Sequence, residues 1–156
     1  MTSKIPDRLQ QLYNLFSGRV GAHSDLGLLL DDIDNSTVRV ILPYQDKHSG
    51  NPQERSLHST SLLTAIDSTC GFAVMLSLDT PQAIATVSLR VDHICKPGTG
   101  QDVALEAVCY AHEGGFAYVR AKAVSEDNTA LFSSGIGVFK IGSPGPDLLS
   151  ANISKL

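Results

Sequence analysis

The sequence predicts an α+β fold in which an antiparallel sheet wraps around one long central helix, at about residues 58–78. The first observation is a run of apolar and small neutral residues from Leu57 to Leu78, which is too long for an ordinary strand. The second is a series of strand-like segments after that run, separated by turn residues. Strands grouped with one long helix are typical of α+β folds, and a helix that is apolar on most faces must be enclosed.

The segments before the long helix predict one short helix and one hairpin. Residues 5–16 have apolar residues at helical spacing, and Gly18 and Gly21 should end this helix. Residues 26–33 and 37–42 flank a turn cluster and indicate a hairpin. A polar loop is expected to follow, over residues 43–56.

The segments after the long helix predict a meander of four strands. Alternating apolar residues and intervening Gly, Pro, Asp and Asn turns define them at residues 84–94, 103–109, 116–124 and 131–141. The expected organisation is an N-terminal helix and linker, a main domain and a flexible tail, at residues 1–22, 23–141 and 142–156.

Composition limits the classes of partner. The 156 residues fit one domain, and a net charge of -4 with 18% charged residues does not favour binding to nucleic acid or to an anionic membrane. Cys70, Cys95 and Cys109 are odd in number and form no Cys-x-x-Cys pair, so we expect buried thiols in a reducing compartment and no metal or redox cofactor.

The chain ends in Ser154-Lys155-Leu156, a tripeptide that the peroxisomal import receptor reads. In a eukaryote this ending would predict the peroxisomal matrix, whereas in a bacterium it would carry no meaning and the protein would be cytoplasmic. The bacterial, cytoplasmic reading is favoured, and no signal peptide is apparent at the N-terminus.

Asp67 is the one charged residue in the long helical run, since the nearest charged residues are Arg55 and Asp79. Such a group needs a partner, a shifted pKa or a chemical role. The start of the helix near His58 offers free N–H groups that can polarise a carbonyl, but Asp67 lies about 14 Å farther along the axis. If both serve one reaction, two helices must meet antiparallel, and the site requires a dimer.

Several short motifs, together with their spacing along the chain, resemble those of one protein family. The sequence Asn51-Pro52 is followed by Leu57-His58, by Asp67 with Gly71 four residues later, by Thr86, and by Lys96-Pro97. Over roughly residues 26–141 the pattern is similar to that of the hot-dog-fold acyl-CoA thioesterases of the phenylacetic-acid-degradation (PaaI-like) type.

The resemblance implies a role for each matching residue. Asp67 would be the general base or nucleophile, and the backbone N–H of Ser59 would help to form the oxyanion site. Asn51 would position the water or the carboxylate, and Thr86 would be a hydroxyl contributed by the other subunit. His58 belongs to the same motif, and the family forms dimers that are commonly paired into tetramers.

Two departures from the family pattern stand out. Ser59 and Thr60 occupy positions where the family usually has two glycines, so that two side chains stand where glycine permits close approach. His93 stands where the family usually has Phe or Tyr.

Each candidate residue also has a purely structural interpretation. Asp67 can be a carboxylate bonded to hydroxyl groups, and His58 can brace the start of the helix. Asn51 can form a turn before Pro52, and Thr86 can be an ordinary strand residue.

The favoured function is hydrolysis of an acyl-CoA thioester to the free acid and CoA-SH by a homodimer or homotetramer, with no nucleic-acid or membrane partner. A non-catalytic acyl-CoA binding module is the main alternative. A hydratase or dehydratase ranks behind both, because the chain has neither an Asp-x4-His spacing nor a His-Phe-Pro-Gly segment.

Overall fold

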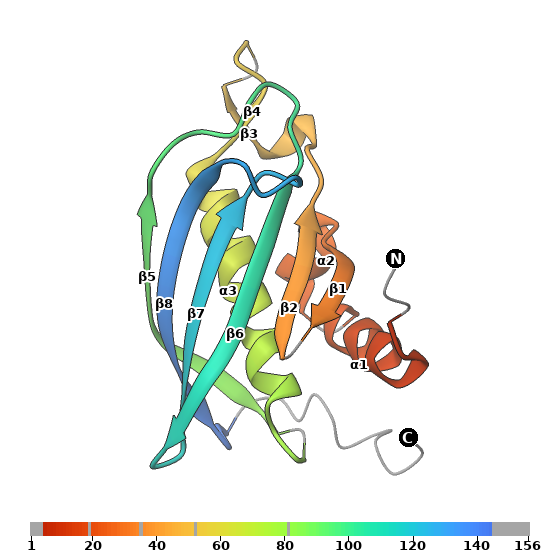
Figure 1. Cartoon of the computed structure of the whole chain (residues 1–156), viewed down its shortest axis with the longest axis vertical. Helices are drawn as coiled ribbons and strands as arrows, with labels where there is room; N and C mark the ends of the chain where they lie inside the picture. The colour runs from red at the N-terminus through yellow and green to blue at the C-terminus, as the bar shows by residue number, and fades with distance from the viewer. Residues whose placement is uncertain (1–4, 19, 35, 52, 81, 145–156) are drawn as a thin grey trace.

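A curved antiparallel sheet holds one long helix against its concave face (Figure 1). The computed structural model describes residues 5–18, 20–34, 36–51, 53–80 and 82–144. The helices are α1 (Asp7–Ser17), α2 (Gly21–Leu26) and α3 (Ser59–Leu76), with a short 3-10 turn at Asp46–His48. The strands are β1 (Leu29–Asp34), β2 (Thr37–Leu42), β3 (Ser49–Asn51), β4 (Ser56–Leu57), β5 (Ile84–His93), β6 (Val103–Glu113), β7 (Phe116–Val124) and β8 (Leu131–Ile141).

The main sheet has the order β1-β2-β6-β7-β8-β5, and all of its neighbouring strands are antiparallel. Gly114 and Gly115 connect β6 to β7 with positive φ angles, which suit a two-residue hairpin turn. In the described part of the chain, β5 pairs with β8 on one side only, so it forms an edge of the sheet. The predicted fold class, a sheet around one central helix, is confirmed.

Helix α3 is the centre of the core. It packs against five strands, and Ile66, Cys70, Phe72 and Val74 on it are fully buried. The side chains of β2, β6 and β7 that face α3 alternate with outward-facing ones, as the pleat of a strand requires. By length and composition alone α3 could cross a membrane, but most of it is buried inside the protein, as expected for a core helix.

The N-terminal region departs from the prediction, because Gly21 does not end a helix but begins α2. Helix α2 is six residues long and ends at Gly27 in the left-handed conformation, with φ 66°. So short a helix is not stable alone, and it depends on tertiary contacts that local sequence does not reveal. The buried side chains of Tyr13, Phe16 and Leu26 provide them, since they belong to the same core as α3.

The polar segment before α3 also contains more structure than a plain loop. Strands β3 and β4 pair as a small antiparallel ribbon that leads directly into α3. Residues 145–156 lie outside the described residues, and with them most of the predicted tail and Ser154-Lys155-Leu156.

Candidate active site

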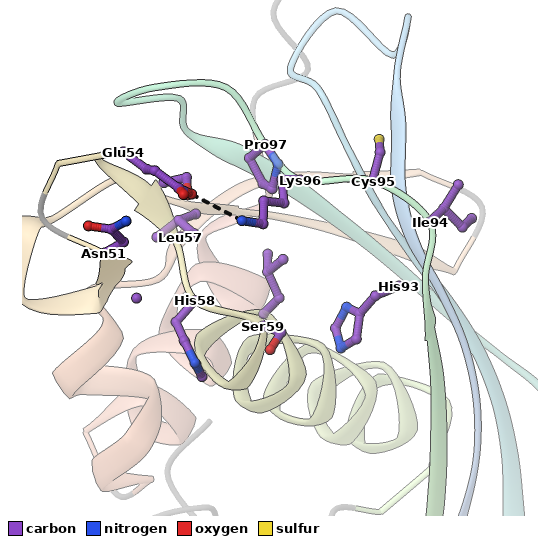
Figure 2. A pocket seen from close by; sticks show the side chains of 13 residues that line it. Asn51, Glu54, Leu57, His58, Ser59, His93, Ile94, Cys95, Lys96 and Pro97 are labelled. Carbon is purple, nitrogen blue, oxygen red and sulfur yellow. Dashed lines mark hydrogen bonds and ion pairs between the residues drawn. The ribbon is translucent and has the colours of Figure 1, made fainter.

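A cleft of about 560 Å³ opens at the N-terminal end of α3 (Figure 2). The β3–β4 ribbon, the first turn of α3 and the chain leaving β5 form its walls. The cleft therefore brings together segments that are far apart in the sequence. Its lining includes Asn51, Leu57, His58, Ser59, His93 and Lys96.

The first turn of α3 supplies hydrogen-bond donors to this cleft. His58 is the N-cap residue, and its Nδ1 accepts a hydrogen bond from the backbone N–H of Thr60 at 3.1 Å. Ser59, the first helical residue, is exposed, and the described backbone hydrogen bonds include none that its N–H donates. The positive end of the helix dipole adds to this free N–H, so the position suits a carbonyl oxygen that gains negative charge.

Asn51 has a structural role and also faces the cleft. Its Oδ1 accepts a hydrogen bond from the backbone N–H of Gln53 at 3.1 Å, which is an Asx turn. Its backbone oxygen accepts hydrogen bonds from the N–H groups of Glu54 and Arg55. The structural interpretation of Asn51 is therefore correct, and its place in the cleft leaves a role in water positioning open to test.

Two segments that wall the cleft are tied to each other. Lys96 Nζ lies 3.0 Å from Glu54 Oε2, and this hydrogen-bonded ion pair holds the pKa of the exposed Glu54 carboxyl below its usual value. The N–H of Gly100 donates to the backbone oxygen of Arg55 at 2.7 Å. Because one backbone bond accompanies the exposed ion pair, the relative position of the two segments does not depend on that ion pair alone.

Asp67 and Thr86 form a separate pair. Thr86, near the start of β5, donates its hydroxyl hydrogen to Asp67 Oδ1 at 2.9 Å. Asp67 is half-buried, and neither residue lines the cleft. Nine residues of helix, about 14 Å, separate Asp67 from His58. Within one chain the candidate residues thus fall into two groups: Asn51, His58 and Ser59 at the cleft, and Asp67 with Thr86 farther along α3.

The side of α3 that carries Asp67 is only partly covered by the chain's own sheet, which reaches it through Thr86 of β5. Thr60, Leu63, Thr64 and Asp67 recur at helical spacing, and each is at least partly exposed. Leu63 is 39% exposed, and Val87 on the edge strand β5 is 57% exposed. Apolar side chains on a partly uncovered helix face and on a sheet edge are typical of a surface that contacts another protein chain.

One polar arrangement near Asp67 gave no signal in the sequence. His23 is 1% exposed, and its Nδ1 and Nε2 lie 2.6 Å from Ser68 Oγ and from the Tyr13 hydroxyl oxygen, respectively. Burial lowers the pKa of His23 to about 4 and raises the pKa of Tyr13. Since Ser68 is 45 residues away along the chain, no local pattern connects it with His23.

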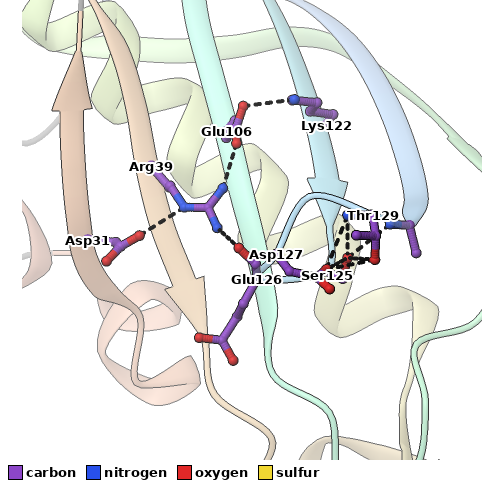
Figure 3. Close-up of polar contacts among 9 residues, drawn as sticks. Asp31, Arg39, Glu106, Lys122, Ser125, Glu126, Asp127 and Thr129 are labelled. Atoms are coloured by element: carbon purple, nitrogen blue, oxygen red, sulfur yellow. Dashed lines mark hydrogen bonds and ion pairs between the residues drawn. The ribbon is translucent and has the colours of Figure 1, made fainter.

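A second charged cluster lies away from the cleft (Figure 3). Arg39 on β2 forms ion pairs with Asp31 and Glu106 and donates to the backbone oxygen of Glu126, and Lys122 lies 3.0 Å from Glu106. The cations lower the pKa of Glu106 although its partial burial acts in the opposite direction. These bonds link β1, β2, β6 and β7, so we interpret the cluster as structural.

Comparison with known proteins identifies one related sequence. No family model matches the chain. A protein of Halobacterium salinarum that bears the name putative esterase is 32% identical over 107 residues, which are 67% of this chain and 70% of that protein.

Solved structures agree on the fold. A Pseudomonas aeruginosa protein superposes with a TM-score of 0.76 at 25% identity, covering 85% of this chain and 98% of that one. The PaaI protein of the E. coli phenylacetic acid degradation operon gives 0.73 at 12% identity, covering 88% and 96%. Thioesterase superfamily member 2 of Mus musculus gives 0.73 at 15% identity, covering 89% and 100%.

The chain belongs to the family of this putative esterase, and it has the hot-dog fold of the PaaI protein and of thioesterase superfamily structures. The resemblance carried by the motifs is thereby confirmed. The relative bears the name putative esterase, and several of the structures with this fold are of thioesterases or thioesterase superfamily proteins.

Proposed function

We propose that the protein hydrolyses acyl-CoA thioesters at a site that two subunits build together. This proposal rests on the positions of the candidate residues, which fall into two separate groups along α3. The cleft and the free N–H of Ser59 lie at the start of the helix, whereas Asp67 and Thr86 lie about 14 Å away and outside the cleft.

A two-fold axis between antiparallel α3 helices would bring these groups together. Each Asp67 would then face the first turn of the partner's helix, and the dimer would hold two equivalent sites. The exposed face of α3 and the open edge of β5 lie on the same side of the chain as Asp67, which supports this arrangement. Pairing into tetramers is a further possibility that the proposal does not require.

The reaction follows from the two groups. The thioester carbonyl oxygen would accept a hydrogen bond from the N–H of Ser59, with Asn51 beside it in the cleft. Asp67 of the partner subunit, oriented by its Thr86, would take a proton from water or attack the carbonyl directly. In either route the carbonyl carbon becomes tetrahedral, and the C–S bond then breaks with its electron pair on sulfur. In the direct route the acyl group is then held by Asp67 as an anhydride, and water hydrolyses this anhydride to the free acid and restores the carboxylate.

The first test replaces Asp67 with asparagine and measures thiol release across a panel of aryl, short-chain and medium-chain acyl-CoA substrates. We expect Asp67→Asn to lower kcat at least about 100-fold, because general bases typically contribute 10²–10⁴-fold. Circular dichroism should show an unchanged fold, since asparagine can still accept the hydrogen bond from Thr86.

Asp92→Asn is a matched control, because Asp92 is an exposed carboxylate on the same strand as Thr86 and pairs only with Arg90 among its described contacts. Its activity should equal that of the wild type. Full activity in Asp67→Asn would refute the assignment of Asp67.

A non-catalytic acyl-CoA binding protein is the second candidate. The side chains of Ser59 and Thr60 are exposed at the start of α3, where they could hinder close approach of a thioester. Purified protein that binds acyl-CoA but releases no thiol from any substrate of the panel would favour this candidate.

The cell compartment that we propose depends on the source of the protein. The protein would be cytoplasmic in a bacterium, and Ser154-Lys155-Leu156 would direct it to the peroxisomal matrix in a eukaryote. In a eukaryote, removal of these three residues should abolish import into peroxisomes, and fluorescence microscopy can test this.

A further inference from the structure

His93 lies in the cleft opposite the first turn of α3. It is the last residue of β5, and Figure 2 shows its ring directed toward Ser59. Its register partner on β8 is Ser133, and His93 Nδ1 lies 3.0 Å from Ser133 Oγ. Ser133 is 0% exposed, so a buried hydroxyl group fixes one side of an otherwise exposed imidazole ring.

This contact determines which ring nitrogen carries the proton. In the described residues, His93 is the hydrogen-bond partner that the structure gives to Ser133 Oγ. A buried hydroxyl hydrogen without an acceptor is costly, so Ser133 donates and Nδ1 of the neutral ring accepts. The proton of the ring is then on Nε2, the nitrogen that Ser133 does not engage.

Several other polar side chains of the cleft have partners among the described residues. Lys96 is paired with Glu54, and Nδ1 of His58 accepts the helix-capping hydrogen bond. The thiol of Cys95 donates to the backbone oxygen of Leu131 at 3.3 Å. The described contact of the His93 ring uses Nδ1, so its Nε2–H is a donor, on the cleft side opposite Ser59, that no described residue engages.

From this arrangement we propose that His93 is a catalytic residue that stabilises the departing thiolate. The inference rests on the proposed hydrolysis of thioesters. When the tetrahedral intermediate collapses, the C–S bond breaks and its electron pair moves to sulfur. The Nε2–H of His93 donates a hydrogen bond to this sulfur and keeps its proton, and the thiolate takes its proton from the general base or from solvent.

The role predicts a dependence on the leaving group. A thiolate of high basicity leaves slowly and gains most from a hydrogen bond, whereas an aromatic thiolate leaves readily without one. A group that only supports the fold, or only binds the carbonyl oxygen, would affect both kinds of substrate alike.

The test compares two thioesters of one acyl group, one with N-acetylcysteamine and one with a nitrothiophenol. Both lack the nucleotide part of CoA, so they differ chiefly in the basicity of the leaving thiolate. We expect His93→Phe to lower kcat/KM about 10- to 100-fold for the N-acetylcysteamine thioester and less than about threefold for the aryl thioester. His93→Gln, whose side-chain N–H can replace Nε2–H, should recover part of the loss.

His112→Phe provides a matched control, because His112 is an exposed histidine on β6 that does not line the cleft. It should leave both rates unchanged. Equal losses for the two thioesters in His93→Phe, or no loss for either, would overturn the role of His93. A wild-type protein that hydrolyses neither thioester nor any acyl-CoA would instead contradict the proposed function.

Discussion

Asp67 and Ser68 are neighbours on α3 but lie in opposite environments. Asp67 faces the partly uncovered side of the helix and accepts a hydrogen bond from Thr86. Ser68 points inward, to His23 and through it to Tyr13. The turn of α3 that holds the proposed catalytic carboxylate is thus fixed by a polar contact on each side.

The buried His23 predicts that stability falls in mild acid. Its pKa is near 6.5 in the unfolded chain and about 4 in the folded protein, so the unfolded chain binds more protons between these values. Stability due to His23 is therefore complete above about pH 6.5 and is lost as the pH falls toward 4. We expect this residue alone to lower the free energy of unfolding by roughly 2 kcal/mol between pH 7 and pH 4.5.

Urea unfolding at the two pH values, in wild type and in His23→Gln, measures this contribution. Glutamine can form hydrogen bonds at this position but does not titrate, so the pH dependence should be weaker in the variant. His112→Gln, at an exposed histidine, should retain the pH dependence of the wild type. Identical pH dependence in all three proteins would show that His23 is not responsible.

The predictability of single residues depended on how far away their partners are. Asp67 was visible because no other charged residue lies in the helical run. His58 and Asn51 follow from local capping and turn chemistry, which operates over two or three residues. The bonds of His23 to Ser68 and of His93 to Ser133 span 45 and 40 residues, and only the folded chain reveals them.

Helix α3 contains only apolar and small neutral residues apart from Asp67, and this composition made it the most predictable part of the fold. The strands after it were also predicted, because alternation and turn residues are local signals. Helix α2 was missed because it is six residues long and glycine begins it, so that its stability comes from packing.

Gly71 in the middle of α3 predicts that an alanine there would stabilise the protein. A helix-interior glycine costs up to about 1 kcal/mol relative to alanine. An added Cβ would lie 3.6 Å from Ile84 Cδ1 and 3.7 Å from Phe16 Cζ, which are ordinary contacts. We therefore expect Gly71→Ala to raise the free energy of unfolding by up to about 1 kcal/mol.

Gly137→Ala on β8 is the matched comparison. Its Cβ would lie 3.3 Å from the backbone oxygen of Ser88 and 3.2 Å from Leu89 Cδ1, so this substitution should destabilise the protein. Urea titrations of the wild type and of the two variants measure these changes in the free energy of unfolding. A loss of stability in Gly71→Ala would mean that the packing around the centre of α3 is tighter than these distances indicate.

The whole molecule, as proposed, is active only as a dimer, and mixing two inactive variants can test this. Ser59→Pro removes the backbone N–H at the first helical position, where proline is tolerated. His58 before it is extended, with ψ 144°, as proline requires. Ser59→Ala retains the N–H and should retain activity.

Asp67→Asn and Ser59→Pro should each be inactive when pure. After unfolding and refolding together in equal amounts, half of the dimers should be mixed, and each mixed dimer should contain one intact site. We expect about a quarter of the wild-type activity. No recovery, with mixed dimers demonstrated by native mass spectrometry, would place Asp67 and Ser59 of the same chain in one site.

The open edge of strand β5 affects how a newly made chain behaves before it forms the proposed dimer. Ten residues of backbone lie along this edge, and Val87 is exposed on it. Until a second copy covers them, their free N–H and C=O groups can accept any extended peptide, including one from another newly made chain. A slowly assembling population would therefore be exposed to aggregation, and in the proposed dimer rapid pairing of subunits would protect solubility as well as provide activity.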